Sequence, residues 1–310
     1  IGRFHPLLVH LPIGLIVLGV TALGAAFVAA LSAALLSPFA PCLASDAAAL
    51  APHERVVISY DLPGDPALEP IREALIGARA LERFRETLSG FRLRRPISAR
   101  TASCAGEANA AYDADAITVC YEYAARVAAL ARHPSRPAWI GEEDAIAGPI
   151  LDVFLHEAAH ALFDQFEIPI LGRGEDAADA VASLFVLHLS EEAAKARVAA
   201  IAFMYLETAG LEAATLAEAR LRDFRADDFA NGHGTPLQRH YNLICLAYGF
   251  DPGRFADAVA LSAMPASRAA GCALEYREAL RAFRRLLGPH LDPQAAEAAF
   301  GRGDALLRAP

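Results

Sequence analysis

The residues best placed to do chemistry in this sequence are two histidines and a glutamate within five positions: His156, Glu157 and His160. In a helix, residues four apart lie one above the other, so the two imidazoles can bind one metal ion from the same face. Glu157 lies at the rim of that face, where its carboxylate can reach a water molecule beside the metal. Two ligands, a general base and an open coordination position are typical of zinc-dependent hydrolysis. The motif therefore predicts a site for one zinc ion.

The sequence around the motif favours a buried helix over two histidines on a protein surface. Residues 150–155 before it and 161–163 after it are mostly apolar and contain neither proline nor glycine. Apolar residues at helical spacing would bury one side of such a helix. Gly148 and Pro149 are expected to open the helix, because proline suits the first helical turn.

A third protein ligand is needed to complete a catalytic zinc site. After a turn rich in proline and glycine, a second helix is predicted from Glu175, with Asp176 beside it and Asp179 one turn later. This E-x-x-x-D pattern after H-E-x-x-H resembles the gluzincin (thermolysin-like) peptidases. The resemblance implies that Glu175 is the third ligand and that Asp179 accepts the free ring N–H of His156. The spacing from His160 is shorter than in thermolysin-like enzymes, so Asp176 stays an alternative ligand.

Several other segments resemble an uncharacterised bacterial family of metallopeptidase-like proteins, a domain of unknown function, over about residues 50–290. These segments are residues 109–113, 117–122, 172–179, 238–242 and 275–276, together with His233, Cys245 and Cys272. This chain has Gly174 where the family is expected to carry another acid, which leaves the choice between Glu175 and Asp176 open. The resemblance implies metallopeptidase chemistry and no particular substrate.

A polar segment between two predicted helices supplies candidates for stabilising the oxyanion of a reaction intermediate. His233, Arg239 and Tyr241 are of the residue types that do this, and the family resemblance points to the same region. We favour His233 among the three. The alternative interpretation is a polar loop followed by a half-buried Arg/Tyr network.

Four of the five cysteines are expected to form two disulfides, Cys104–Cys120 and Cys245–Cys272. Each closure would stabilise the fold by roughly 3 kcal/mol in the chain-entropy model and would favour an oxidising compartment. Zinc binding by these cysteines is the alternative, but the sequence has no C-x-x-C spacing.

The N-terminal region has the composition of a membrane segment. Residues 7–36 include no Asp, Glu, Lys or Arg. This stretch is long enough to span a bilayer as a helix. Arg3 precedes the stretch and the next basic residue is Arg55, so the positive-inside rule predicts a cytoplasmic N-terminus and a catalytic domain outside. A cleaved signal peptide and a buried soluble helix are the alternatives.

The first residues also resemble the opening of a family of small multi-helix bacterial membrane domains. Residues 5–14 carry this resemblance, and only the first such helix is present. Because the sequence starts at Ile1 without a methionine, we expect a fragment or an unusual fusion at this end. We assign no function to His5 or His10.

The order of predicted elements indicates an α+β, zincin-like fold with a small mixed sheet, an active-site helix and a mainly helical C-terminal half. Strands are predicted at 55–60, 91–99 and 116–121, and helices at 68–88, 122–133 and 237–248. In zincins the edge strand before the metal helix pairs with substrate, a role that we assign to residues 117–121. Trp139 is expected in the core.

The domain organisation follows from these elements. We expect a transmembrane helix or signal anchor at 1–36, a linker at 37–54 and a metallopeptidase domain at 55–310. That domain divides into an α+β part, 55–190, and a helical part, 191–310.

Composition and motifs together predict an exported, membrane-tethered zinc metallopeptidase of the bacterial cell envelope, acting on peptides or proteins. The net charge of −9 argues against nucleic acid as a partner. One alternative is a non-catalytic zinc-containing envelope binding or scaffold protein, although such a protein would not need Glu157 as a base. Another is a soluble cytosolic domain in which the motif is accidental.

Overall fold

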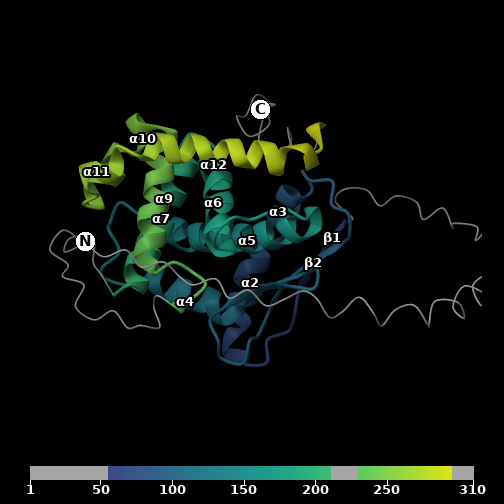
Figure 1. Cartoon of the computed structure of the whole chain (residues 1–310). Helices are drawn as coiled ribbons and strands as arrows, with labels where there is room; N and C mark the ends of the chain where they lie inside the picture. The colour runs from purple at the N-terminus through teal and green to yellow at the C-terminus, as the bar shows by residue number, and fades with distance from the viewer. Residues whose placement is uncertain (1–54, 211–229, 295–310) are drawn as a thin grey trace, which may run out of the picture. The chain divides into compact units, whose positions relative to one another are not determined.

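The structure is a computed structural model that describes residues 55–210 and 230–294, all within one compact unit, Leu50–Pro310 (Figure 1). The expected membrane helix at 7–36 and the linker at 37–54 lie outside the described residues. The described part combines one small sheet with a larger number of helices, which confirms the mixed α+β class.

The sheet has four strands in the order β1-β2-β4-β3. The strands are β1 (Val56–Tyr60), β2 (Ile97–Ala102), β3 (Ala110–Asp113) and β4 (Ala116–Cys120). β1, β2 and β4 run parallel, and β3 pairs antiparallel with β4. The side chains of Ile97, Ala99, Ile117 and Val119 are buried at alternating positions, as expected for a sheet with one face on the core.

The strand β3 corrects the sequence analysis. Ala114 and Asp115 both take positive φ, 46° and 66°, and together they form a two-residue hairpin turn that joins β3 to β4. Such turns are usually marked by glycine or asparagine, and this one is not. β3 is therefore the edge strand, and the assignment of that role to residues 117–121 was wrong, because β4 lies between β2 and β3.

Two helices stand where one was predicted at 68–88. They are α2 (Glu69–Gly77) and α3 (Ala80–Leu88), and a short 3₁₀ helix η2 (Pro66–Leu68) precedes them. The helical conformation is interrupted at Arg79, which takes a left-handed conformation with φ of 52°. The amphipathic α3 buries Leu81, Phe84 and Leu88 against β1, β2 and α5.

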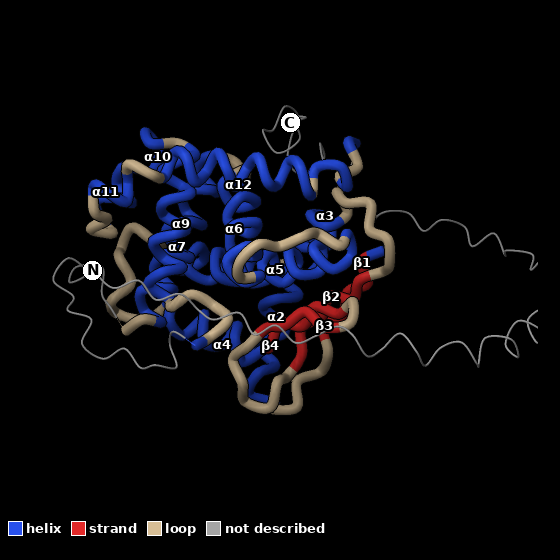
Figure 2. Tube along the Cα trace, in the orientation of Figure 1, coloured by secondary structure: helices blue, strands red, loops and turns tan. Residues whose placement is uncertain are grey.

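The long helix α5 (Glu142–Phe166) is the centre of the fold and carries the H-E-x-x-H motif. It packs against β3, β4, α3 and α4 (Tyr121–Ala131) as well as α6 (Gly174–Leu187) and α7 (Glu191–Thr208). Figure 2 shows the strands gathered below α5 and the C-terminal helices above and beside it. By length and composition α5 is the one described helix that could cross a membrane, but 67% of its apolar window is buried within the protein, as in a core helix.

The start of α5 differs from the prediction that Gly148 and Pro149 open it. The helix begins at Glu142, with three acids in its first turn, and continues through Pro149. Gly148 is needed at the contact with α7, because a Cβ there would lie 2.8 Å from the Cβ of Ala200. The two residues thus mark a close helix contact.

The C-terminal helices pack on α6 and α7 and are joined by a disulfide. They are α9 (Pro236–Phe250), α10 (Pro252–Leu261), α11 (Ala266–Ala269) and α12 (Cys272–Leu286), followed by the 3₁₀ helix η4 (Gly288–His290). Cys245–Cys272 links α9 to α12 and Cys104–Cys120 anchors the loop before β3, so both predicted disulfides are confirmed. Trp139 is 62% exposed, so its assignment to the core was wrong.

Candidate metal centre

Three side chains converge on one point between α5 and α6. The Nε2 atoms of His156 and His160 are 3.2 Å apart, and Glu175 Oε2 lies 3.0 Å from the first and 3.3 Å from the second. Ligands at about 2.0–2.1 Å from a tetrahedral ion would be about 3.3–3.4 Å from one another. The spacing of the three atoms therefore fits a common metal ion.

Local structure explains how Glu175 reaches the two histidines. α5 ends at Phe166, and the chain turns through Gly172, whose φ of 99° favours glycine. α6 then begins at Gly174 and packs along α5, so that the first turn of α6 faces the second half of α5. Glu175 in that first turn thus lies opposite the histidine pair.

Asp179, one turn further along α6, orients His156. Its Oδ1 lies 2.7 Å from His156 Nδ1, which leaves Nε2 directed at the shared point. Arg239 on α9 donates two hydrogen bonds to the same carboxylate, with distances of 2.7 Å and 2.6 Å. Burial alone would raise the pKa of Asp179, but His156 and Arg239 together lower it to about 2.

The charge of Asp179 also acts on the histidine. Burial favours the neutral imidazole, but the hydrogen bond and negative charge of Asp179 outweigh it and raise the pKa of His156. A carboxylate behind a ligating histidine fixes the ring orientation and makes its free nitrogen a better donor to a metal.

Glu157 lies beside the histidines and is only 7% exposed. Burial raises the pKa of its carboxyl group, while the nearby His156 and His160 pull it down. The backbone of Tyr112 on β3 donates a hydrogen bond to Glu157, which ties the carboxylate to the edge strand. Raising the pKa of a carboxylate makes it a stronger base, as proton transfer near neutral pH requires.

His233 also reaches this centre, from the loop before α9. Its Nε2 is 2.7 Å from Glu175 Oε2, and its ring stacks on that of His156 with centroids 5.6 Å apart. His156, Glu175 and His233 form a second trio whose ligand atoms lie within 4.8 Å of one another. The trio with His160 has its three ligand atoms 3.0–3.3 Å apart, and its two histidines come from the same helical face.

Two other residues singled out in the sequence lie elsewhere. Asp176 forms an ion pair with Arg173 at 2.8 Å, and among the described residues no hydrogen bond or ion pair joins it to the histidine pair. The hydroxyl of Tyr241 donates to the carbonyl oxygen of Ser262, 3.2 Å away, and Tyr241 does not line the pocket beside the metal centre. The structure therefore brings His233 and Arg239 to the centre and leaves Tyr241 out.

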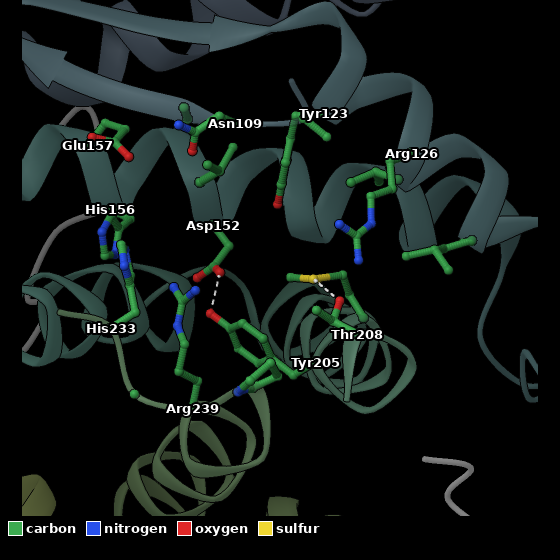
Figure 3. A pocket seen from close by; sticks show the side chains of 18 of the residues that line it. Asn109, Tyr123, Arg126, Asp152, His156, Glu157, Tyr205, Thr208, His233 and Arg239 are labelled. Carbon is green, nitrogen blue, oxygen red and sulfur yellow. Dashed lines mark hydrogen bonds between the residues drawn. The ribbon is translucent and has the colours of Figure 1, made fainter. Parts of the chain in front are cut away.

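A pocket of about 470 Å³ opens directly beside the metal centre (Figure 3). Its walls come from the loop before β3, from α4, α5 and α7, and from the segment that leads into α9. His156, Glu157, His233 and Arg239 lie at one end, and Arg126 extends into the pocket at the other (Figure 3). His156 and His233 are therefore accessible from the pocket.

Asp152, which sequence reasoning missed, lies on the pocket floor one turn before His156. The hydroxyl of Tyr205 donates to its Oδ2 at 2.9 Å, and the Arg239 guanidinium lies 4.7 Å above the Tyr205 ring. Burial raises the pKa of Asp152 to about 6, against the opposing charge of Arg239. Its position four residues before His156 was the available signal, because that spacing places both on one helix face.

Another group of potential ligand atoms in the described residues comprises Cys104, Cys120 and Glu122. The two cysteines are bonded to each other, so their sulfurs are not free to bind a metal. The Glu122 carboxylate instead accepts hydrogen bonds from the backbone of Cys104 and Gly106.

Comparison with known proteins agrees with this geometry. Residues 60–287 match the family DUF4344, whose description is "Putative metallopeptidase", and the chain belongs to this family. Membership suggests metal-dependent proteolysis, and with it a bound metal ion and a peptide or protein substrate. No curated protein and no solved structure matches the chain significantly.

Proposed function

We propose that this protein is a zinc-dependent peptidase of gluzincin type with a zincin-like catalytic region. The observation that carries the proposal is the convergence of His156 Nε2, His160 Nε2 and Glu175 Oε2 within 3.0–3.3 Å of one another. Two imidazoles and one carboxylate suit zinc, and three protein ligands leave a position open for substrate. When bound there, the ion would polarise the peptide carbonyl and lower the pKa of water.

Glu157 is the proposed general base. Its carboxylate takes a proton from the attacking water and then transfers it to the leaving amine nitrogen. Burial and the hydrogen bond from Tyr112 hold this carboxylate in place beside the pocket. A base fixed in this way loses little entropy when it acts.

His233 and Arg239 have different proposed roles. His233 is 45% exposed in its side chain and sits at the pocket, so its ring can donate to the oxyanion that forms when water attacks. The guanidinium of Arg239 donates two hydrogen bonds to Asp179. Because Asp179 contacts His156, Arg239 positions His156 indirectly.

The edge strand β3 is the proposed docking strand for the substrate backbone. One side of β3 pairs with β4, which leaves its other side available for an extended peptide. The loop just before β3 lines the pocket, and the backbone of Tyr112 contacts Glu157. A peptide added to this edge would therefore pass the general base.

We further propose that the protein works in the bacterial cell envelope, exported and tethered by the apolar segment 7–36. The two disulfides support this location, because such bonds persist in oxidising compartments.

The test combines metal content with hydrolysis by the purified full-length chain. We expect one zinc per chain and cleavage of an unstructured protein such as casein. Glu157→Gln should keep the zinc and reduce hydrolysis by about 10²–10⁴-fold, the usual contribution of a general base. Glu143→Gln, an exposed glutamate at the start of the same helix, is the matched control and should behave as wild type.

Two results would overturn the proposal. Equal hydrolysis by Glu157→Gln and wild type would remove Glu157 as the base. Bound zinc without hydrolysis of any peptide would favour a non-catalytic binding or scaffold protein instead.

A further inference from the structure

We infer that the pocket beside the metal centre selects substrates by a carboxylate group, which Arg126 binds. This inference names the substrate class of the proposed peptidase and rests on that function only for the statement that peptides enter the pocket. The carboxylate comes either from an acidic side chain or from the C-terminus of the peptide.

Arg126 belongs to the stripe of α4 that faces the pocket. Tyr123, Arg126, Val127 and Leu130 all line it, at the i, i+3, i+4 and i+7 positions of a helix. Figure 3 shows the Arg126 side chain extending from α4 into the pocket, toward Thr208 on α7. A guanidinium thus occupies one position of an otherwise largely apolar stripe.

The other charged groups of the pocket already have partners. Arg239 is bound in a two-pronged ion pair by Asp179, and Asp152 accepts the hydroxyl of Tyr205 beside Arg239. Glu157 is bound by the backbone of Tyr112. Among the described residues, no hydrogen bond or ion pair engages the Arg126 guanidinium.

The chemistry of the free guanidinium determines the ligand. Arginine presents several N–H donors in a plane that matches a carboxylate and has no acceptor of its own. Its position at the opposite end of the pocket from His156 and Glu157 favours a group carried some distance from the cleaved bond (Figure 3). Glutamate, with one methylene more than aspartate, suits that separation better.

A basic substrate side chain is the competing possibility, because Asp152 also lines the pocket. Asp152 is buried at 6% exposure, is bound by Tyr205 and lies in the field of Arg239. The one charged group of the pocket without a described partner is the Arg126 guanidinium, which would repel a lysine and can pair with a glutamate. The observations therefore favour the acid.

The test measures binding in the Glu157→Gln background, which separates recognition from cleavage. Calorimetry on the full-length chain compares blocked, C-terminally amidated hexapeptides Ala-Ala-Ala-Xaa-Ala-Ala with Xaa as Glu, Asp, Gln or Lys. An all-alanine peptide with a free C-terminus distinguishes the two sources of carboxylate. We expect the Glu peptide, or the free-acid peptide, to bind about tenfold more tightly than the uncharged ones, as for a charge-assisted hydrogen bond.

Substitutions of Arg126 then identify the residue responsible. Arg126→Gln should bring the carboxylate preference to within about twofold, and Arg126→Glu should reverse it in favour of Lys. Arg126 is exposed, so both variants should fold, as thermal unfolding will check. Arg132→Ala is the matched control, because Arg132 lies at the end of the same helix, outside the pocket, and pairs with Glu142.

Several outcomes would overturn the inference: no carboxylate preference in the parent, a preference for Lys, no binding of any peptide, or a preference unchanged in Arg126→Gln. Hydrolysis by the wild type is measured in parallel. A carboxylate preference without hydrolysis would reject the proposed function and keep the pocket assignment. Hydrolysis abolished by Glu157→Gln but without such a preference would reject only the pocket assignment.

Discussion

Two buried histidines, His156 and His240, lie in regions with opposite hydrogen-bonding arrangements. His240 on α9 is 1% exposed, and its two ring nitrogens contact the carbonyl oxygen of Ala202 and the hydroxyl of Ser262, each at 3.0 Å. His156 is 3% exposed, but one of its nitrogens meets a carboxylate and the other points at a place shared with His160 and Glu175.

The difference shows that burial alone does not identify a functional histidine. Burial lowers the pKa of His240, whose neutral partners complete its hydrogen bonding. At His156 the carboxylate of Asp179 more than offsets burial and raises the pKa. A binding centre is recognised by a nitrogen that converges with other donors, and a structural histidine by two nitrogens with separate protein partners.

The largest expected effect tests this contrast through His160, the histidine that converges on the same point as His156. His160→Ala removes one of three converging donors and should weaken zinc binding by at least about 100-fold, more than loss of a supporting residue does. His240→Ala should leave zinc binding within about twofold and lower the free energy of unfolding by about 2–4 kcal/mol, because it leaves a cavity and two unpaired groups. Chelator competition and urea unfolding measure the two effects.

The contrast would break if the two variants exchanged phenotypes. Loss of zinc in His240→Ala with an intact fold would place His240 in the centre. Unchanged zinc affinity in His160→Ala would favour the trio that includes His233.

A smaller effect is expected from Asp179→Asn, which keeps the shape of the side chain and removes its charge. His156 would lose its orienting carboxylate and Arg239 its ion-pair partner, so zinc affinity should fall about 10–100-fold. The same chelator competition measures it. Asp176→Asn is the matched control, since Asp176 lies on the same helix and its ion-pair partner in the described part of the chain is Arg173. An equal loss of zinc affinity there would reject the orienting role.

An effect of similar size concerns the pH dependence of stability at Asp152. Its folded-state pKa of about 6 exceeds the ordinary value of 3.8, so the folded protein binds more protons and loses stability as the pH rises from about 4 to 6. Asp152→Asn cannot ionise. Its stability relative to wild type should therefore increase by about 2–3 kcal/mol between pH 4 and pH 8.

Urea unfolding of the metal-free protein across that pH range checks the sign. If the free energy of unfolding changes with pH in the same way in wild type and variant, Asp152 titrates normally. A relative loss of stability of the variant with rising pH would mean that the Arg239 charge outweighs burial.

The sequence predicted those parts of the site that depend on helical periodicity. Spacing alone placed His156 and His160 on one face of α5, and resemblance to gluzincins placed Glu175 and Asp179 opposite them, as the structure has them. The disulfides also followed from the sequence.

The rest depended on conformations and contacts without a local signal. The turn at Ala114 and Asp115 has no glycine or asparagine, so β3 was missed and the edge strand misassigned. Arg79 is neither proline nor glycine, yet its left-handed conformation interrupts the predicted helix 68–88, two residues after Gly77. Arg126 on α4 lines the same pocket as His156 and Glu157 on α5, and nothing in its local sequence indicates this.

His156, Glu157 and His160 project from α5, a helix with most of its residues buried, so apolar packing can assemble the centre before an ion binds. Small zinc domains are unfolded until metal arrives, since binding supplies most of their folding free energy. In this protein the apolar packing of α5 against its neighbours stabilises the fold around the centre. An ion at this centre would then bind after folding, so a chelator should remove it without unfolding the protein, and returning the ion should restore activity.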